Sequence, residues 1–177
     1  MGLVWVTGVS GAGKSSVCEV LKIRGHQAID ADWEGLSRWV DRHTDEVQVD
    51  PPYPVPRGWL DDFAWKIDVG RVESLAEASR LVMTFLCGSA ENEVEVSHLF
   101  DAVVCLVIDD ETLRHRLAIR TTNQFGKHPE ELAAALAWNR RESQRYLELG
   151  ASLVDATRPL EDVVRDVLIV ARPHRQP

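Results

Sequence analysis

The chain reads Gly8-Val9-Ser10-Gly11-Ala12-Gly13-Lys14-Ser15 near its beginning, which fits the pattern G-x-x-x-x-G-K-[ST] at every fixed position. A buried-strand pattern over 3–7 precedes this stretch, and a helix-forming pattern over 15–24 follows it directly. Strand, glycine-rich loop and helix in this order cradle phosphate groups, because the glycines let backbone N–H groups point inward and the helix adds its positive N-terminal end. The sequence therefore predicts a site for a nucleoside triphosphate.

The residue types in this loop predict distinct contacts. Lys14 is expected to reach the β- and γ-phosphates of ATP, and the Ser15 hydroxyl to coordinate Mg²⁺. We also expect the Lys14 head to face solvent and to support no core. The residues predicted to contact the nucleotide phosphates are Gly8, Ser10, Gly11, Ala12, Gly13, Lys14, Ser15 and Ser16. ATP and Mg²⁺ are thus the predicted cofactors.

Composition limits the class of protein. The chain has 177 residues, of which 45% are apolar and 27% charged, as expected for a single globular domain over residues 1–177. A net charge of −8 argues against a nucleic-acid partner, because no basic surface is available for a phosphate backbone. Three cysteines in apolar segments predict buried free thiols in a reducing compartment. With no membrane-spanning run or signal peptide, we expect a cytoplasmic protein without membrane contact, as a monomer or homodimer.

Strand-like and helix-like segments alternate, which is typical of a parallel α/β sheet. The predicted strands cover 3–7, 27–31, 81–86, 102–108 and 151–154. The predicted helices cover 15–24, 111–120 and 130–149, and a last helix starts at Pro159. Segment 92–100 fits either a strand or a helix.

Two segments break this alternation. Segment 44–57 contains Pro51, Pro52, Pro54 and Pro56 and cannot form a regular element. Segment 121–128 is polar and joins two predicted helices. Long loops in compact domains are commonly functional. We therefore predict an acceptor-site insertion at about 33–66 and a lid at about 121–129.

The whole chain resembles small P-loop kinases of the nucleoside monophosphate, shikimate and gluconate kinase group. The order of features is similar: phosphate loop, short strand ending in acids, insertion, central strand, lid, and the turn Asp155-Ala156-Thr157 before the last helix. The resemblance implies a three-layer α/β/α fold with a five-stranded parallel sheet in the order 2-3-1-4-5. It also implies transfer of the γ-phosphoryl group from ATP, with Mg²⁺, to a small-molecule or nucleotide acceptor.

Asp30 and Asp32 are the candidate carboxylates. Residues i and i+2 of a strand point to the same side, so both are expected to face the crevice at the strand ends. Related kinases place an acid here on the acceptor hydroxyl or on Mg²⁺, which implies a catalytic role for Asp32 and metal contacts for Ser15, Asp30 and Asp32. The alternative is that both cap a helix starting near Trp33. The Asp109-Asp110 pair more simply caps the helix over 111–120, which leaves no Walker B acid.

The candidate cations lie in the second half of the chain. The resemblance implies that Arg116 and Arg120 hold the adenine or the phosphates, and that Arg141 contacts the transition state or the substrate. The alternative is an ordinary solvated helix face. The loop containing Arg158 and Pro159 resembles the segment that lies along the adenine in this group.

Four tryptophans fall in or near the predicted insertion: Trp33, Trp39, Trp59 and Trp65. They predict either an aromatic wall for the acceptor or ordinary core packing. A kinase is the leading functional hypothesis. The alternative is a nucleotide-binding regulatory P-loop ATPase without a small-molecule acceptor; a guanine-recognition motif Asn-Lys-x-Asp is absent.

Overall fold

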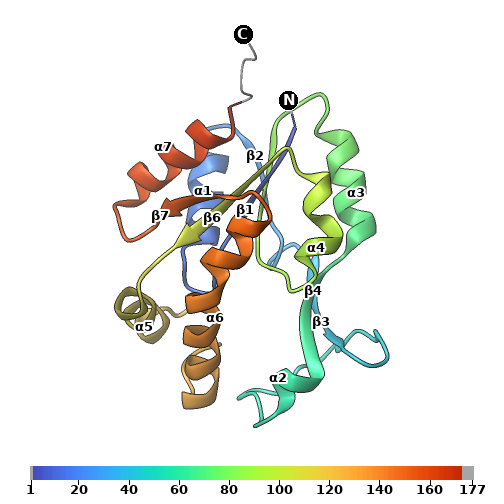
Figure 1. The fold of residues 1–177 in the computed structure, drawn as a ribbon, viewed down its shortest axis with the longest axis vertical. Helices are drawn as coiled ribbons and strands as arrows, with labels where there is room; N and C mark the ends of the chain where they lie inside the picture. The colour runs from blue at the N-terminus through green and yellow to red at the C-terminus, as the bar shows by residue number, and fades with distance from the viewer. Residues whose placement is uncertain (1, 173–177) are drawn as a thin grey trace.

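A five-stranded parallel sheet forms the centre of the protein in a computed structural model, which describes residues 2–172 (Figure 1). The strand order is β2-β5-β1-β6-β7. The strands are β1 (Leu3–Thr7), β2 (Gln27–Asp30), β5 (Thr84–Cys87), β6 (Ala102–Val107) and β7 (Ser152–Asp155). When only the five strands of this sheet are numbered along the chain, the order is 2-3-1-4-5, as predicted. The predicted fold class is confirmed.

Helices cover both faces of the sheet and complete the three layers (Figure 1). One face packs against α1 (Lys14–Ile23), α5 (Asp110–Ile119) and α7 (Leu160–Val170). The other packs against α3 (Val69–Ala78), α4 (Glu93–Val96) and the end of α6 (Pro129–Glu148). The predicted helices are thus present within one residue of their predicted bounds, and the ambiguous segment 92–100 is helical, as α4 followed by a short 3-10 turn (Ser97–Leu99).

Strand β1 lies at the centre of the sheet and is buried on both faces. Its side chains alternate: Val4 and Val6 join the core under α1 and α7, whereas Leu3 and Trp5 join the core under α3. The Trp5 indole N–H donates to the Gly88 carbonyl at 2.9 Å, so the one polar atom of this buried ring is satisfied. The three cysteines are buried free thiols, as predicted.

A second, two-stranded sheet was not predicted. Strands β3 (Ser37–Asp41) and β4 (Phe63–Ile67) pair antiparallel, with Trp39 opposite Trp65. This hairpin projects beyond the strand ends of the main sheet (Figure 1). Between its strands, segment 44–57 contains no helix or strand and one isolated bridge, Val40 to Val47, as its prolines predict. A short helix, α2 (Trp59–Asp62), leads into β4.

The predicted strand boundaries were wrong by three residues at the start of the central strand, and by one residue at its end and in β2, β6 and β7. The central strand starts at Thr84, and Leu81 before it is 81% exposed, because an apolar run alone does not show which of its residues pair. Strand β2 ends at Asp30, and turns over 31–35 lead into β3. No helix starts near Trp33, so the helix-cap interpretation of Asp30 and Asp32 is also wrong.

Leu117 on α5 supports two loops, the phosphate loop at Gly11 and the segment before α6 at Gly126. Its side chain lies so close that a Cβ added at Gly11 or at Gly126 would lie 3.2 or 2.9 Å from a Leu117 methyl carbon. We expect Leu117→Ala to lower the free energy of unfolding by about 2 to 5 kcal/mol, because Leu117 is fully buried and truncation leaves a cavity. Ile119→Ala, at a position 63% exposed on the same helix, is the control, with an expected change below about 0.5 kcal/mol. Equal losses in urea unfolding would contradict this role.

Candidate active site

Glycines shape the loop between β1 and α1. Gly8, Gly11 and Gly13 have φ values of 141°, 97° and 107°, which L side chains rarely adopt. Gly13 is the N-cap residue of α1 and provides no side-chain hydrogen bond, so the first N–H groups of that helix remain available to an anion. The loop therefore has the backbone geometry that its sequence predicts.

Lys14 is buried, which corrects the expectation of a solvent-facing head. It is 7% exposed, and its ammonium donates to the carbonyl oxygens of Gly8 at 2.7 Å and Val9 at 3.1 Å. These bonds arise because α1 starts at Lys14 itself, so the side chain folds back over the loop. The ammonium is thereby held against the loop that is predicted to receive phosphate.

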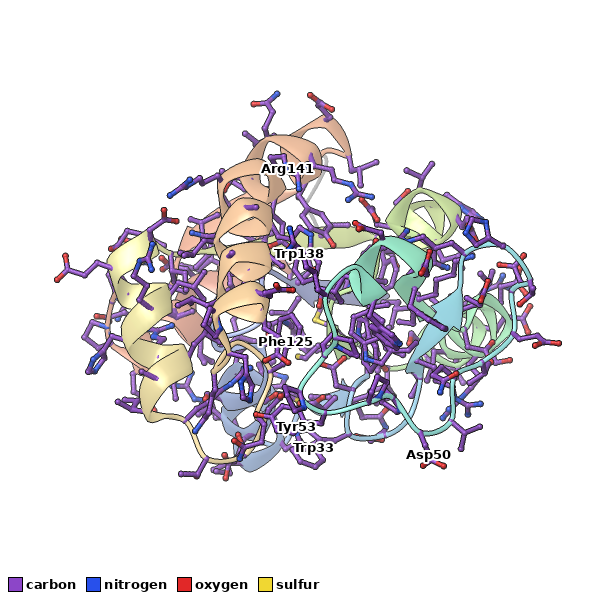
Figure 2. All side chains as sticks on the ribbon, turned by 90° about the horizontal axis from the view of Figure 1, so that it is seen from below. Trp33, Asp50, Tyr53, Phe125, Trp138 and Arg141 are labelled. Atoms are coloured by element: carbon purple, nitrogen blue, oxygen red, sulfur yellow. The ribbon has the colours of Figure 1, made fainter. Side chains whose placement is uncertain are left out.

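A cavity of about 1610 Å³ joins this loop to the β3–β4 hairpin and to one face of α6. Pockets for a single drug-sized ligand commonly have about 300 to 1,000 Å³, so this one has room for two small ligands. Most of the predicted phosphate contacts line it, namely Ser10, Gly11, Ala12, Gly13, Lys14, Ser15 and Ser16. Gly8, the first residue of the loop, is not part of the wall. Figure 2 views this end of the molecule, with Trp138 and Arg141 on α6 and Phe125 in the segment before it.

The two predicted carboxylates lie in different environments. Asp32 lines the cavity, whereas Asp30 does not. The Asp30 carboxylate accepts from the backbone N–H groups of Asp32 at 3.1 Å and Trp33 at 3.2 Å, so it stabilises the turn after β2. The expected strand alternation fails because β2 ends at Asp30. Asp32 accepts from the Trp65 indole N–H at 3.3 Å; burial by surrounding atoms raises its pKa, and the nearby Lys14 ammonium opposes that rise.

Arg116 and Arg120 project from α5 and hold three loops together. Arg116 donates to the Ala12 carbonyl at 3.0 Å and to the Ala156 carbonyl at 2.7 Å, joining the phosphate loop to the segment after β7. Arg120 donates to the Ser10 hydroxyl at 3.2 Å and to the Phe125 carbonyl, joining the phosphate loop to the predicted lid. Both side chains line the cavity, and their contact with a nucleotide stays a prediction.

The remaining predicted cations differ in their partners. Arg141 lines the cavity and donates to the Ala137 carbonyl of its own helix at 3.3 Å. Arg158 also lines the cavity and forms ion pairs with Asp155 and Asp166, whereas Pro159 is the N-cap residue of α7 and does not contribute to the wall. Asp109 caps α5 through the Thr112 N–H at 2.7 Å, as predicted.

Glu131 connects the two irregular segments and was not identified from the sequence. It is fully buried at the start of α6. Its carboxylate accepts from the Gly126 N–H of the predicted lid at 2.8 Å and from the Val55 N–H of the proline-rich segment at 3.1 Å. A long-range partner such as Val55 leaves no local sequence signal. The lid and the insertion are therefore fixed to each other at this point.

Three of the four tryptophans around the insertion line the cavity: Trp33, Trp39 and Trp65. Trp59 does not line it, and packs edge-on against Trp39 with a centroid separation of 4.8 Å. Trp33 is exposed and the other three are partly exposed, so none belongs to the buried core. The aromatic-wall alternative thus agrees with their positions better than core packing does.

Sequence reasoning also missed the acids on the far side of the cavity, Glu91, Glu93 and Glu142. Glu142 lies on α6 four residues after Trp138 and four before Tyr146, and all three line the cavity. That helical spacing could have identified it. Burial raises the pKa of Glu142 to about 7, and the Lys14 ammonium opposes the rise.

The fold and the glycine-rich loop define a class, the P-loop nucleotide-binding α/β domains. Residues 4–145 match the family described as AAA domain, which is more than half of the chain, and the protein belongs to that family. Comparison with curated proteins gives no match. Among the described residues, no helix combines the length and apolar character that crossing a membrane requires.

Solved structures of small kinases share this fold. A sugar kinase from Janibacter sp. HTCC2649 has 17% identity and a TM-score of 0.59, covering 96% of this chain and 94% of its own. A gluconokinase from Sinorhizobium meliloti 1021 has 23% identity and a TM-score of 0.53, covering 96% and 91%. A shikimate kinase from Acinetobacter baumannii, in complex with shikimate, has 16% identity and a TM-score of 0.57, covering 95% and 91%. At these identities the likeness shows the fold alone.

The raised pKa of Glu142 predicts a pH-dependent stability. The folded protein binds this proton more tightly than the unfolded chain, whose carboxyl has the ordinary pKa of 4.5. Its stabilising contribution is complete below about pH 4.5 and is lost as pH rises through about 7. Relative to wild type, Glu142→Gln should therefore gain about 1 to 3 kcal/mol in free energy of unfolding between about pH 5 and about pH 8. A difference that stays constant over this range, measured by urea unfolding, would contradict it.

Proposed function

We propose that the protein is an ATP-dependent phosphotransferase that moves the γ-phosphoryl group to a hydroxyl of a small-molecule or nucleotide acceptor. One observation carries the proposal: a single cavity joins the phosphate loop to Asp32 and the tryptophan-lined hairpin. Phosphoryl transfer requires positioned phosphates, cations around the moving group and an acceptor held in line. A nucleotide-binding regulatory module needs no second compartment of this kind.

The phosphate end of the cavity supplies the binding groups for ATP. The loop and α1 offer backbone N–H groups, and Lys14 would exchange its carbonyl partners for the β- and γ-phosphates. Arg116 and Arg158, which line the cavity, would border the nucleoside portion, whereas Pro159 is not part of the wall. Arg120 and Arg141 would surround the transferring phosphoryl group, where positive charge stabilises the transition state.

The donor set at this end fits Mg²⁺. Ser15 and Asp32 line the same cavity and offer a hydroxyl and a carboxylate beside the phosphate site. Mg²⁺ retains several waters and commonly needs only one or two protein oxygens together with substrate phosphates. The described residues contain no cluster of three or more acidic, His or Cys ligands, so phosphate and water would complete the shell. Bound there, Mg²⁺ would neutralise charge on the phosphate oxygens. Asp30 is committed to its turn and is a poorer candidate.

Asp32 is positioned to act on the acceptor. Its carboxylate lies on the cavity wall, near Lys14, and the Trp65 indole orients one of its oxygens. It would accept a hydrogen bond from the acceptor hydroxyl and take its proton as the bond to phosphorus forms. The kinase folds described above support acceptors of small-molecule size, since the shikimate kinase carries shikimate.

Lys14→Met tests the role of the phosphate loop. The substitution keeps a buried, unbranched stem but removes the charge that is expected to hold the phosphates, so kcat should fall on the order of 10²-fold or more. Lys22→Met, on the exposed face of the same helix, is the matched control and should retain activity. Acceptor-dependent ADP release measures both. Wild-type turnover by a folded Lys14→Met protein would refute the assignment.

Asp32→Asn tests the acceptor role separately. The amide oxygen can still accept from Trp65, but the group cannot take a proton, so kcat should fall on the order of 10²-fold or more while ATP affinity changes little. Asp50→Asn, at an exposed position in the proline-rich segment, is the control. If Asp32→Asn turns over normally with saturating acceptor, proton transfer to Asp32 is excluded.

A further inference from the structure

The acceptor end of the cavity has an excess of carboxylates. We define this end as the wall formed by the turn after β2, the β3–β4 hairpin with α2, the segment after β5 and the inward face of α6. Its acids are Asp32, Asp61, Glu91, Glu93 and Glu142, and its arginines are Arg42, Arg141 and Arg145. Whether these arginines are free decides whether an anionic acceptor could be held there.

Arg42 is already paired within the protein. Its guanidinium lies 2.5 Å from the Glu91 carboxylate and also donates to the Leu60 carbonyl. Glu91 is fixed in turn, because its other oxygen accepts from the Trp65 N–H at 3.0 Å. This pair ties the hairpin to the segment after β5. Using Arg42 to bind an anion would break that connection.

Arg145 is paired as well, and its partner is poorly satisfied. The guanidinium faces Glu93 and donates to the Glu91 carbonyl at 3.1 Å. Glu93 is 1% exposed, and neither of its carboxylate oxygens has a hydrogen bond of good geometry among the described residues. A buried carboxylate in this state is costly. A hydrogen-bond donor arriving in the cavity would relieve that cost.

Glu142 has no ion-pair or hydrogen-bond partner among the residues that the structure describes. The charges that act on it most are those of Lys14, Glu93 and Arg145. Lys14 is committed to the phosphate end, and Arg145 to Glu93. Once the phosphates of ATP pair with the Lys14 ammonium, no nearby cation is left to neutralise the carboxylate of Glu142. The acceptor end then attracts positive charge.

The aromatic wall suits the same kind of ligand. Trp39 and Trp65 line the same cavity as these acids, and their rings lie 5.2 Å apart between centroids. Indole faces attract cations, and carboxylates beside them add to that preference. Arg141 argues against a preference for cations, because it forms no ion pair among the described residues and could bind an anion. Under the proposed function, however, it serves the phosphoryl group.

We propose that the acceptor is an aminoalcohol, a hydroxyl compound with a protonated amine, whose ammonium group binds Glu142 beside the indoles while its hydroxyl faces Asp32. This inference rests on the proposed function, since it assigns chemistry to the acceptor of that same site. It counts against carboxylate-bearing and phosphate-bearing acceptors, which would meet Glu93 and Glu142 while Arg141, the arginine of this wall without an ion pair among the described residues, serves the phosphoryl group.

Three probes of similar shape test the charge preference by calorimetry at about pH 8: phenylalaninol as the cation, phenylpropanol as the neutral alcohol and phenyllactate as the anion. Each is titrated into protein saturated with Mg²⁺ and a non-hydrolysable ATP analogue. Phenylalaninol should bind about tenfold or more tightly than either other probe. Glu142→Gln should remove that advantage, and Glu148→Gln should keep it, because Glu148 is exposed outside the cavity and its carboxylate accepts from the Gln144 side chain.

The outcomes separate this inference from the proposed function. A preference for phenyllactate, equal binding of all three probes, or no binding by any of them overturns the aminoalcohol assignment. So does an ammonium preference that survives Glu142→Gln. Acceptor-dependent ADP release with an anionic compound would overturn it too, while supporting the kinase function. Conversely, Glu142-dependent binding of phenylalaninol without transfer to any hydroxyl compound would support the cation site and count against the kinase.

Discussion

The close approach of the phosphate loop to β6 and α5 is the constraint on which the rest of the site depends. A Cβ at Gly8 would lie 2.6 Å from the Leu106 carbonyl, and one at Gly11 would lie 3.0 Å from a Leu113 methyl carbon. Only glycine fits such contacts with positive φ angles. The same helix that supplies Leu113 and Leu117 beneath the loop projects Arg116 and Arg120 around it. Packing and hydrogen bonding from α5 therefore act together to hold the loop open toward its ligand.

Polar contacts connect the irregular segments around the cavity to the elements of the main fold. Glu131 accepts hydrogen bonds from the lid and from the proline-rich segment, and Glu91 ties the hairpin to the end of β5. Neither contact belongs to a regular sheet or helix of the main fold. Because Glu131 is fully buried, separating its carboxylate from these donors would leave a buried charge without partners, so this connection holds the irregular segments in place. The main sheet and its helices carry the phosphate loop, and the less regular segments carry the wall to which we assign the acceptor.

The sequence predicted the nucleotide end better than the acceptor end, for physical reasons. The phosphate loop and the sheet order follow from local patterns: glycines, a buried strand and alternating elements. The hairpin was missed because its strands are separated by more than twenty residues rich in proline, so no turn signal joins them. Lys14 proved buried because its ammonium folds back onto carbonyls of its own loop. Asp30 and Asp32 face different surroundings because β2 ends at Asp30, and sequence patterns do not fix a strand end to one residue. Glu142 was predictable in principle from its spacing with Trp138 and Tyr146.

The central claim is that one cavity holds ATP and a hydroxyl acceptor together, so that the γ-phosphoryl group passes to carbon-bound oxygen and not to water. Phosphorus NMR on a reaction with Mg·ATP and a pooled set of hydroxyl compounds, weighted toward aminoalcohols, follows the fate of that group directly. The account predicts a new phosphate monoester resonance that grows in step with ADP, with little inorganic phosphate, and almost no ATP loss when the pool is omitted. ATP consumed at the same rate with and without the pool, and recovered entirely as ADP and inorganic phosphate, would contradict it.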